Sequence, residues 1–568
     1  MRRLADPGPA STGGSRIGGP RVRVAAQPDL APGENARGAV SGAAWSYLLP
    51  ERELGTILSL GQPTPPTRAT LEQIGRELIV APKGQLPGPL PAASVGLVAV
   101  LDPWWTDRLA VDRKLGPDLE RVIAADGSVF ARLGRPARVK ARAKAGAQLP
   151  LGSAGEGMLW LGTSAGEIRA VVPAGDGALI DFAIDRWAAD DGSGSPVRRI
   201  ARGTLRRLRG MGFGGELGVL HVPIDAGNVE RPPRYIRIAA AAAGLSIDDR
   251  RWALIDPGSY STKKLLLFLF PPGASEPDLV VKLVRDARFN ARLESAWWAL
   301  SALHVGPSEV HGLGPAPAFF GTHAGLALMG EAIVDGVSLK TLLSGRPDDP
   351  LIAAVVDRLV GLGLASASVS AVSPSEVGAD LREMYERFAE LYRPTPRERK
   401  VLTSAIDRIA GLRRLGLPFP LVLQHGDAGT WNVVVGPDGQ PVLIDWEAAV
   451  PHGMPLWDLL YFLRSAAVGI ARRAGTNDPL VAFEEAYLVG ETPLSRLLAD
   501  ATDRMCDGIG LERNMVEPIF YLCWMHRALK ESSTLRPDRM GRGHYRKLLA
   551  LAIDRRAAPG LQRVFGAD

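Results

Sequence analysis

A carboxylate and a carboxamide follow a short apolar segment in the last third of the chain. Residues 421–424 lead into His425, Gly426 and Asp427, and Asn432 comes five positions after the aspartate. An aspartate in such a place can orient a hydroxyl nucleophile and accept its proton. The oxygen of an asparagine is a hard donor of the kind that magnesium prefers. These residue types therefore suit phosphoryl transfer, in which the protein mainly positions reactants and stabilises charge.

A predicted β-hairpin follows and would bring the chain back to the asparagine. Its strands are residues 433–435 and 442–444, and the turn between them contains Gly-Pro-Asp-Gly. The second strand leads directly into Asp445, which the hairpin would place beside Asn432. One carboxylate and one amide would then converge on a metal-bound phosphate. We predict Asn432 and Asp445 as magnesium ligands.

The catalytic role falls to Asp427, the carboxylate at the end of the first strand. His425 is read as a buried hydrogen-bonding residue that supports the loop rather than one that takes part in the chemistry. Glu447 follows Asp445 closely, and it is either a further contact to the site or part of a structural ion pair. The sequence leaves both readings of Glu447 open.

Taken together, these motifs resemble those of the aminoglycoside phosphotransferase and choline kinase-like family, a branch of the protein-kinase-like fold. The family's H-G-D-x-x-x-x-N and D-W/F-E motifs are present, and residues 453–459 match its G-x-P-x-x-D-L continuation. The resemblance covers residues 236–535 and implies ATP and Mg²⁺ as cofactors. It also implies that Asp458 braces the catalytic loop. Trp431 departs from the pattern, because many members have glycine there.

The resemblance further implies an ATP-binding lobe upstream of these motifs. Lys282 lies in the middle of the predicted strand 279–284, where it would contact the nucleotide phosphates. Glu294, on a following helix, would hold that lysine in place. Gly258 and Ser259 would belong to the loop over the phosphates, where backbone N–H groups bind anions. The segment 326–331, with Met329 and Glu331, would link the lobes and meet the adenine.

The region before this lobe alternates short apolar strands with helical segments. Strands are expected at residues 54–61, 77–81, 95–101 and 217–222, and a helix at 70–76 with Thr70 as its candidate cap. Apolar strands alternating with helices favour a parallel sheet that is covered on both faces. In layout this region resembles class I methyltransferase-like Rossmann domains. Prolines occupy residues 63, 65 and 66, where such a cofactor site needs glycines, so we expect a degenerate domain.

Length and composition set the organisation of the chain. A chain of 568 residues exceeds one ordinary hydrophobic core. We predict a disordered tail over 1–44, a Rossmann-like α/β domain over 45–233, and an α+β kinase-like domain with an ATP-binding lobe over 234–332 and a helical lobe over 333–568. The two cysteines, Cys506 and Cys523, have no metal-site spacing and are expected in the core.

A net charge of +6 over this length is compatible with a nucleotide ligand but does not argue for nucleic acid. No apolar run is long enough to span a bilayer, and a cytoplasmic location is expected. The expected function is transfer of the γ-phosphoryl group of ATP to a hydroxyl of a small molecule of the aminoglycoside, choline-like amine or sugar type. Alternatives are a nucleotide-binding regulatory or scaffold protein and a bifunctional protein with an active N-terminal methyltransferase.

The acceptor is not specified by the sequence. An acidic pocket would indicate a cationic acceptor, but the acidic residues of the helical lobe read equally well as one solvated helix face: Glu376, Asp380, Glu383 and Glu386.

Overall fold

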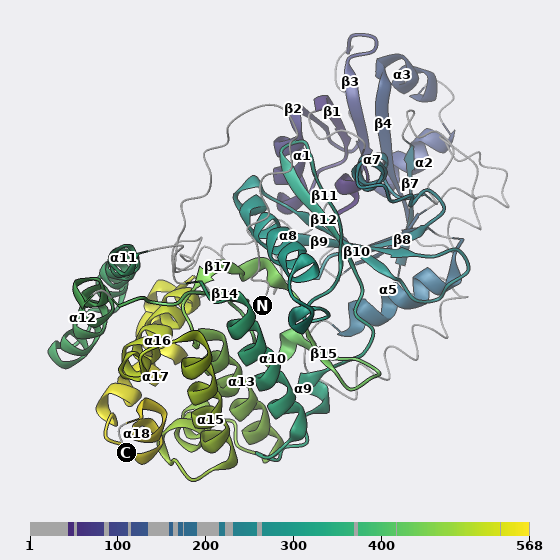
Figure 1. Ribbon diagram of the computed structural model, residues 1–568. Helices are drawn as coiled ribbons and strands as arrows, with labels where there is room; N and C mark the ends of the chain where they lie inside the picture. Colours follow the sequence, from purple (N-terminus) through teal and green to yellow (C-terminus); the bar gives the residue numbers. More distant parts are fainter. Residues whose placement is uncertain are drawn as a thin grey trace. The chain divides into compact units, whose positions relative to one another are not determined.

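The computed structural model describes residues 44–49, 54–84, 90–111, 115–134, 158–162, 168–173, 175–189, 215–221, 231–257, 264–368, 373–415, 417–533 and 535–566. These residues separate into two compact units. The first comprises residues 44–293 and 318–333, and the second comprises 294–317 and 334–566, so the division falls within helix α8 (Asn290–Val305). Figure 1 shows the elements of both units.

Within the first unit, twelve of the described strands form one sheet in the order β11-β12-β10-β9-β8-β6-β5-β7-β4-β3-β1-β2. The strands are β1 (Leu54–Leu60), β2 (Gly75–Ala81), β3 (Val95–Val100), β4 (Ile123–Gly134), β5 (Met158–Gly162), β6 (Ile168–Pro173), β7 (Gly215–His221), β8 (Arg251–Ile255), β9 (Lys264–Phe270), β10 (Leu279–Val284), β11 (Pro317–His323) and β12 (Leu326–Ala332). The helices of this unit are α1 (Pro65–Ile74), α2 (Pro103–Val111), α3 (Leu115–Val122), α5 (Gly177–Ala189) and α7 (Arg234–Ala242).

The sheet is parallel over part of its width and antiparallel over the rest. Strand β1 pairs in parallel with β2 and β3, and β3 pairs in parallel with β4. The pairs β4–β7, β5–β7, β5–β6 and β6–β8 are antiparallel. The expected parallel sheet therefore exists only at β1–β4, and a Rossmann-like domain is not confirmed.

The strand order reverses between β1 and β3, which is where open α/β sheets usually bind ligands. Gly61 follows β1 with a φ of +107°, and a Cβ there would lie 2.7 Å from Cβ of Asp102, which follows β3. Two of the prolines that were expected to disrupt this turn lie in the following helix instead. Pro65 and Pro66 begin helix α1, and Thr64 caps it by accepting a hydrogen bond from the backbone N–H of Thr67.

The helix therefore starts five residues earlier than predicted, and Thr64 rather than Thr70 is its cap.

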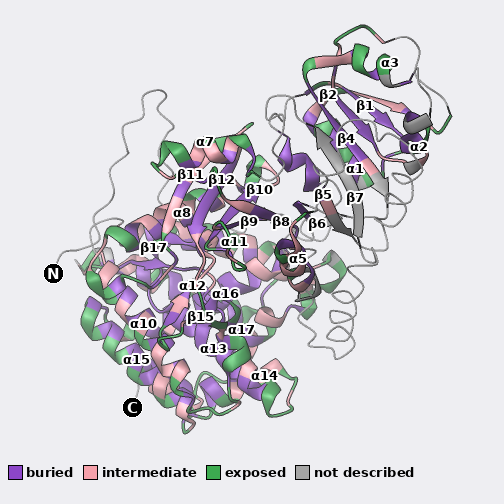
Figure 2. Cartoon of the chain, turned by 90° about the vertical axis from the view of Figure 1, so that its right-hand side faces the viewer, coloured by how far each residue is buried: buried purple, intermediate pink, exposed green. Residues whose placement is uncertain are grey.

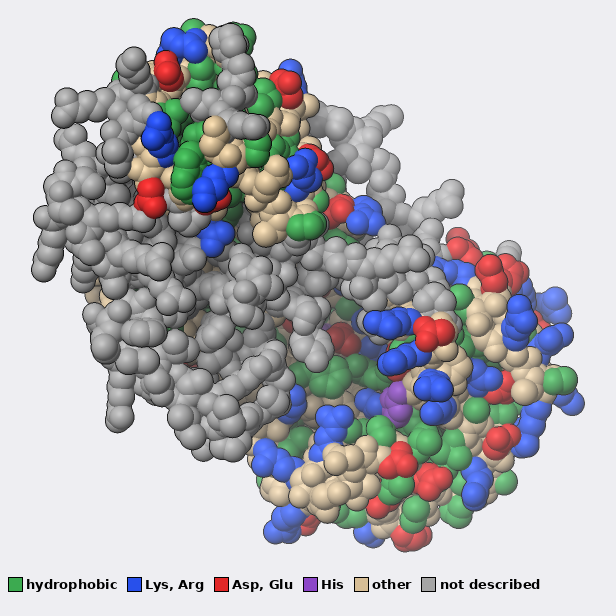
Figure 3. Space-filling view, turned by 180° about the vertical axis from the view of Figure 1, so that it is seen from behind, with side chains coloured by type: hydrophobic (Ala, Val, Ile, Leu, Met, Phe, Trp, Pro, Cys, Tyr) green, Lys and Arg blue, Asp and Glu red, His purple; other side chains and the backbone are tan. Residues whose placement is uncertain are grey.

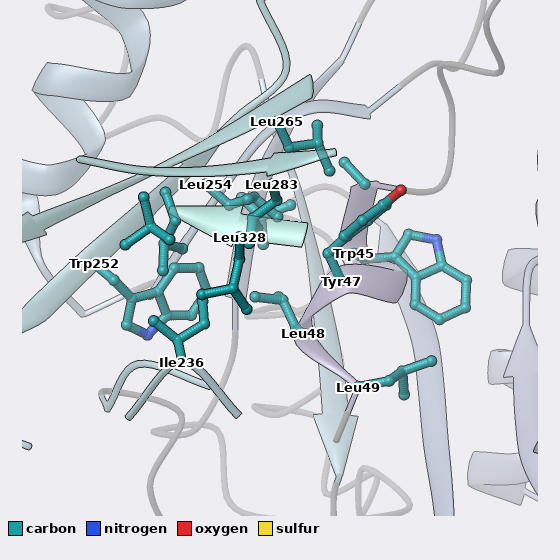
Figure 4. Packing of buried hydrophobic residues seen from close by; sticks show 14 of the residues in the cluster. Trp45, Tyr47, Leu48, Leu49, Ile236, Trp252, Leu254, Leu265, Leu283 and Leu328 are labelled. Atoms are coloured by element: carbon teal, nitrogen blue, oxygen red, sulfur yellow. The ribbon is translucent and has the colours of Figure 1, made fainter. Parts of the chain in front are cut away.

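One hydrophobic core runs beneath strands from both halves of this sheet. Trp45 stacks on Phe130 with ring centroids 3.7 Å apart, and the same cluster of buried residues includes Trp252, Leu265 and Leu328. Figure 4 shows these side chains converging from the segment before β1 and from β8, β9 and β12. The antiparallel pairing of β6 with β8 crosses the predicted boundary at 233/234. The sheet is therefore continuous across residues 233 and 234. The division into two domains at this point stays a prediction.

The second unit is mostly helical, as the sequence predicts for its helical lobe. Its helices are the remainder of α8, α9 (Leu339–Leu342), α10 (Pro350–Ser366), α11 (Pro374–Tyr392), α12 (Pro396–Gly411), α13 (Trp457–Arg473), α14 (Pro479–Phe483), α15 (Pro493–Ile509), α16 (Val516–Ser532), α17 (His544–Asp554) and α18 (Pro559–Phe565). Its short strands are β13 (Val337–Ser338), β14 (Val422–Gln424), β15 (Val433–Val435), β16 (Pro441–Leu443) and β17 (Val450–Gly453).

Helices α13 and α16 form the centre of this unit. Most of their side chains are buried, as Figure 2 shows by colour. Cys506 and Cys523 are buried free thiols, as predicted. On the visible described surface, acidic and basic side chains are interspersed (Figure 3).

Some predictions concern residues outside the described ranges. These include the tail up to residue 43. Ala44 itself begins a short, buried 3-10 helix. No helix in the described ranges is long and apolar enough to cross a membrane.

Candidate active site

The loop that carries Asp427 is held by its own histidine. His425 is fully buried, and its Nε2 lies 3.0 Å from the carbonyl oxygen of Ile444, to which it donates. Its Nδ1 accepts a hydrogen bond from the backbone N–H of Asp427 at 3.2 Å. Burial lowers the pKa of His425, against the opposing charge of Asp458. The imidazole is therefore neutral, and its two hydrogen bonds join the loop to the end of the hairpin.

Asp458 fixes the same loop from the first turn of α13. Its carboxylate accepts hydrogen bonds from two consecutive backbone N–H groups, those of His425 and Gly426, the latter at 3.0 Å. Burial raises the pKa of Asp458, while the charge of Arg527 and the two backbone hydrogen bonds oppose that rise. Asp458 thus joins the start of α13 to the loop that carries Asp427.

Gly426 allows the loop to pass close to the next segment of chain. Its φ is +77°, and a Cβ would lie 2.0 Å from the carbonyl oxygen of Ala448. A side chain here would be strained in backbone conformation and would clash with backbone, so glycine is required on both grounds.

The predicted hairpin is present and brings Asn432 level with the residues before Asp445. Strands β15 and β16 pair antiparallel, and the N–H of Ile444 donates to the carbonyl oxygen of Asn432 at 2.9 Å. The amide Nδ2 of Asn432 donates to Oδ2 of Asp427 at 3.1 Å and to its backbone oxygen at 2.9 Å. With Nδ2 committed to Asp427, the Oδ1 of Asn432 is the atom left to bind a cation.

Asp445 adopts the left-handed backbone conformation, with φ of +65° and ψ of +64°. An aspartate in this region costs some backbone energy, and such conformations often occur at functional sites. The carboxylates of Asp445 and Asp427 are near enough that the charge of Asp445 raises the pKa of Asp427. Glu447 is half-buried in the following 3-10 turn.

Two cations on α16 contact the predicted catalytic carboxylate, and the sequence analysis did not identify either. Nη1 of Arg527 lies 3.3 Å from Oδ1 of Asp427, and Nζ of Lys530 lies 3.8 Å from the same oxygen. Burial raises the pKa of Asp427, but the charges of Lys530 and Arg527 lower it below its ordinary value. Asp427 is therefore ionised at neutral pH. A charged pair inside the largely apolar sequence of α16 is the pattern that indicates them, since such residues are rarely buried unless paired.

The predicted nucleotide residues lie mainly in the first unit. Lys282 is buried on β10, and its Nζ lies 2.9 Å from Oε1 of Glu331 on the neighbouring strand β12. Met329 is fully buried on β12. Glu294, the predicted partner of Lys282, is exposed on α8. Within the first unit, Lys282 has Glu331 as an ion partner, a contact that was not predicted. Gly258 and Ser259 lie outside the described residues.

Part of the chain matches the model of a known protein family. Residues 273–498 match the model of the phosphotransferase enzyme family. The C-terminal half resembles this family. The resemblance and the protein-kinase-like fold predicted for this half are thereby confirmed, and the match supports a small-molecule phosphotransferase in general. No curated protein sequence matches the chain.

Three solved structures are similar to the chain at low identity. An aminoglycoside phosphotransferase from Streptomyces rimosus, in complex with ADP and streptomycin, is 16% identical, with 47% of this chain and 90% of that chain covered and a TM-score of 0.29. The choline kinase LicA from Streptococcus pneumoniae is 14% identical, with 52% and 90% covered and a TM-score of 0.29. The bifunctional kinase-methyltransferase WbdD is 12% identical, with 89% of each chain covered and a TM-score of 0.26.

Proposed function

We propose that the protein transfers the γ-phosphoryl group of ATP to a hydroxyl of a small molecule, with magnesium as cofactor. The observation that carries this proposal is the ionised carboxylate of Asp427, held by Asn432 on one side and by the cations of α16 on the other. A carboxylate fixed in this way can orient a hydroxyl without reorganising during the reaction.

In the proposed reaction, the acceptor hydroxyl donates a hydrogen bond to Asp427 and transfers its proton to that carboxylate. A bond forms between the acceptor oxygen and the γ-phosphorus, and the bond from that phosphorus to the bridging oxygen of ADP breaks. Because the pKa of Asp427 is lowered, the carboxylate acts mainly by orienting the hydroxyl, and it takes the proton late.

The donor set fits magnesium. Asn432 offers a carboxamide oxygen and Asp445 a carboxylate, both hard oxygen donors, and magnesium usually takes one or two carboxylates together with substrate phosphates and water. Bound magnesium would neutralise charge on the phosphate oxygens.

The remaining proposed roles concern the nucleotide. Lys282 would contact its phosphates, and Met329 and Glu331 would line the adenine side through the backbone of β12. Glu294 and the loop of Gly258 and Ser259 would complete the site. Glu331 already holds the Lys282 ammonium, so in this protein β12 would also position that lysine.

An acceptor panel tests the function. Purified protein is incubated with ATP and magnesium and with sugars and amino alcohols, and phosphorus NMR detects phosphorylated products. We expect magnesium-dependent transfer to at least one hydroxyl acceptor. If ATP with magnesium stabilises the protein thermally but no acceptor yields a product, the result would favour a nucleotide-binding regulatory protein instead.

Asp445→Asn tests the metal site separately. Asparagine tolerates the left-handed conformation, so this change removes charge with little change of shape. We expect calorimetry to show ATP affinity falling roughly 10–100-fold when magnesium is present, the range typical of disturbed metal coordination. Affinity without magnesium should not change. Asp438→Asn, in the exposed hairpin turn, is the matched control. Equal affinities for Asp445→Asn and the parent would contradict the role of Asp445.

A further inference from the structure

Trp431 is the residue at which the catalytic loop departs from the family pattern, and its side chain is 41% exposed. Three other tryptophans of the same unit, Trp446, Trp457 and Trp524, are fully buried. A single exposed apolar side chain is ordinary on a protein surface. This one, however, lies directly before the proposed magnesium ligand Asn432. A molecule that covers the indole would therefore lie beside the proposed metal site.

The backbone on both sides of Trp431 is anchored. The N–H of Thr430 donates to Oγ of Ser465 on α13 at 3.0 Å, and both residues are buried. The N–H of Asn432 donates to the carbonyl oxygen of Gly429 at 2.9 Å. Trp431 lies between these anchors in a 3-10 turn, so its side chain leaves the loop from a fixed point.

The indole ring is held as well. A Cβ on Gly429 would lie 2.5 Å from Cζ2 of Trp431, and the next two nearest atoms belong to the same six-membered ring. That ring therefore packs directly on Gly429. The indole also meets Tyr461 on α13 edge to face, with ring centroids 6.1 Å apart and an interplanar angle of 84°. An aromatic side chain held on two sides loses little freedom when it binds a ligand.

Tyr461 connects the indole to the proposed catalytic carboxylate. The guanidinium of Arg527 lies 3.2 Å from the Tyr461 ring centroid, and its Nη1 lies 3.3 Å from Oδ1 of Asp427. Burial and the charge of Asp427 raise the pKa of Tyr461 well above its ordinary value, so its hydroxyl is neutral. Trp431 and Asp427 thus border the same pair of residues, Tyr461 and Arg527. An acceptor whose hydroxyl reaches Asp427 would have the indole beside it.

The arrangement of the rings favours a flat, uncharged ligand over a quaternary ammonium. Choline-like cations are recognised by several aromatic faces that enclose them. Trp431 and Tyr461 instead pack on each other edge to face, and Arg527 lies over the Tyr461 ring, so these two rings do not form such a cage. The exposed part of one indole suits a ligand with C–H groups on one face and hydroxyls at its rim. The C–H groups then leave water, while the hydroxyls stay free to form hydrogen bonds.

We propose that Trp431 binds the acceptor, and that the acceptor is a sugar in its pyranose form, with an apolar face on the indole and a hydroxyl at Asp427. The inference rests on the proposed phosphotransferase function. It assigns to that function one of the acceptor classes that the sequence leaves open, and it gives a role to the residue that departs from the family pattern.

The test compares sugars with their open-chain counterparts: the methyl pyranosides of glucose, galactose and mannose against sorbitol, galactitol and mannitol. Each pair carries similar hydroxyl groups, but only the pyranoside has a flat apolar face. Calorimetry measures binding in the presence of magnesium and a non-hydrolysable ATP analogue, and choline serves as the cationic comparison. We expect at least one pyranoside to bind about tenfold more tightly than its open-chain counterpart, a difference of about 1.4 kcal/mol.

Substitutions in the loop test the part played by the indole. Trp431→Ala should weaken binding of the preferred pyranoside about tenfold and leave that of the open-chain polyol unchanged. Trp431→Phe keeps a ring and should retain part of the preference. Gly429→Ala tests the geometry independently, because its methyl group would displace the indole without removing it. Leu415→Ala, at a position of the same unit that is 71% exposed, controls for the loss of apolar surface.

Affinity for the ATP analogue separates acceptor binding from a disturbance of the loop. Asn432 follows Trp431 directly, so a disturbed loop would also weaken magnesium-dependent binding of the analogue. We expect this affinity to be unchanged in both Trp431 variants. With ATP, Trp431→Ala should raise KM for the sugar about tenfold at an unchanged kcat, the pattern of a contact made equally in the ground state and the transition state.

The outcomes separate the two proposals. A preference for a pyranoside that is lost in Trp431→Ala supports the inference even if no sugar is turned over, a result that would count against the phosphotransferase function alone. Turnover of an acceptor without a sugar ring, unaffected by Trp431→Ala, would support the function and overturn the inference. The inference would also be overturned if no pyranoside bound more tightly than its open-chain counterpart, if choline bound most tightly, or if Trp431→Ala weakened only the ATP analogue.

Discussion

Asp427→Asn is expected to lower the turnover number by about 10²–10⁴, the usual contribution of a positioned general base. The asparagine keeps an oxygen that can accept from Arg527, but it cannot take a proton from the acceptor hydroxyl. The loss should extend over the whole neutral range, because the lowered pKa of Asp427 keeps the parent carboxylate ionised there.

Single-turnover kinetics with a saturating acceptor would measure this effect directly. ATP affinity and the thermal unfolding midpoint should stay near those of the parent, since the one oxygen of the asparagine still accepts from Arg527, and only the hydrogen bond from Nδ2 of Asn432 is lost. Asparagine is preferred to alanine for this reason: alanine would leave the buried Arg527 charge without its partner, and the resulting instability would be confused with lost catalysis. A variant as fast as the parent would show that another group orients the acceptor.

Asp458→Ala is expected to loosen the catalytic loop by about 2–6 kcal/mol, because it leaves two buried backbone N–H groups without an acceptor and each costs roughly 1–3 kcal/mol. Activity should fall with it, since Asp427 is displaced when His425 and Gly426 lose their anchor. Asp458→Asn retains one acceptor oxygen and should show a smaller effect.

Hydrogen exchange of the peptide 421–432, followed by mass spectrometry, would measure the effect where it arises. Protection should fall by about 10- to 10⁴-fold, since 1.4 kcal/mol corresponds to a factor of ten. Asp357→Ala removes an exposed ion pair with Arg504 on the same unit and serves as the control, with an expected change below about 1 kcal/mol. Unchanged exchange in Asp458→Ala would exclude a bracing role.

The parts of the site that the sequence predicted are those that its local patterns determine. The segment from His425 to Asp445 is a strand, a loop and a hairpin, and the turn residues fix its register. Asp458 was found through a motif only 31 residues downstream of Asp427. In these cases the spacing along the chain defines the spacing in the fold.

Contacts between distant segments were not predicted. Arg527 lies 100 positions after Asp427, on a helix without a motif, and only the packing of α16 against the loop brings the two together. The ion pair of Lys282 with Glu331 depends on the antiparallel register of β10 and β12 in the same way. Pro65 and Pro66 were misread for another reason: a proline pair fits the first turn of a helix as well as it interrupts a loop.

The pairing of β6 with β8 has a consequence for how such a chain can arise and be divided. A fragment that begins at residue 234 would expose the edge of β8, and one that ends at 233 would expose β6, each with unpaired backbone groups that invite aggregation. The two segments would also lose the apolar core that they share. Gene fusion or truncation at this point would therefore divide a single folding unit. Either half, expressed alone, would need another strand to pair with its exposed edge.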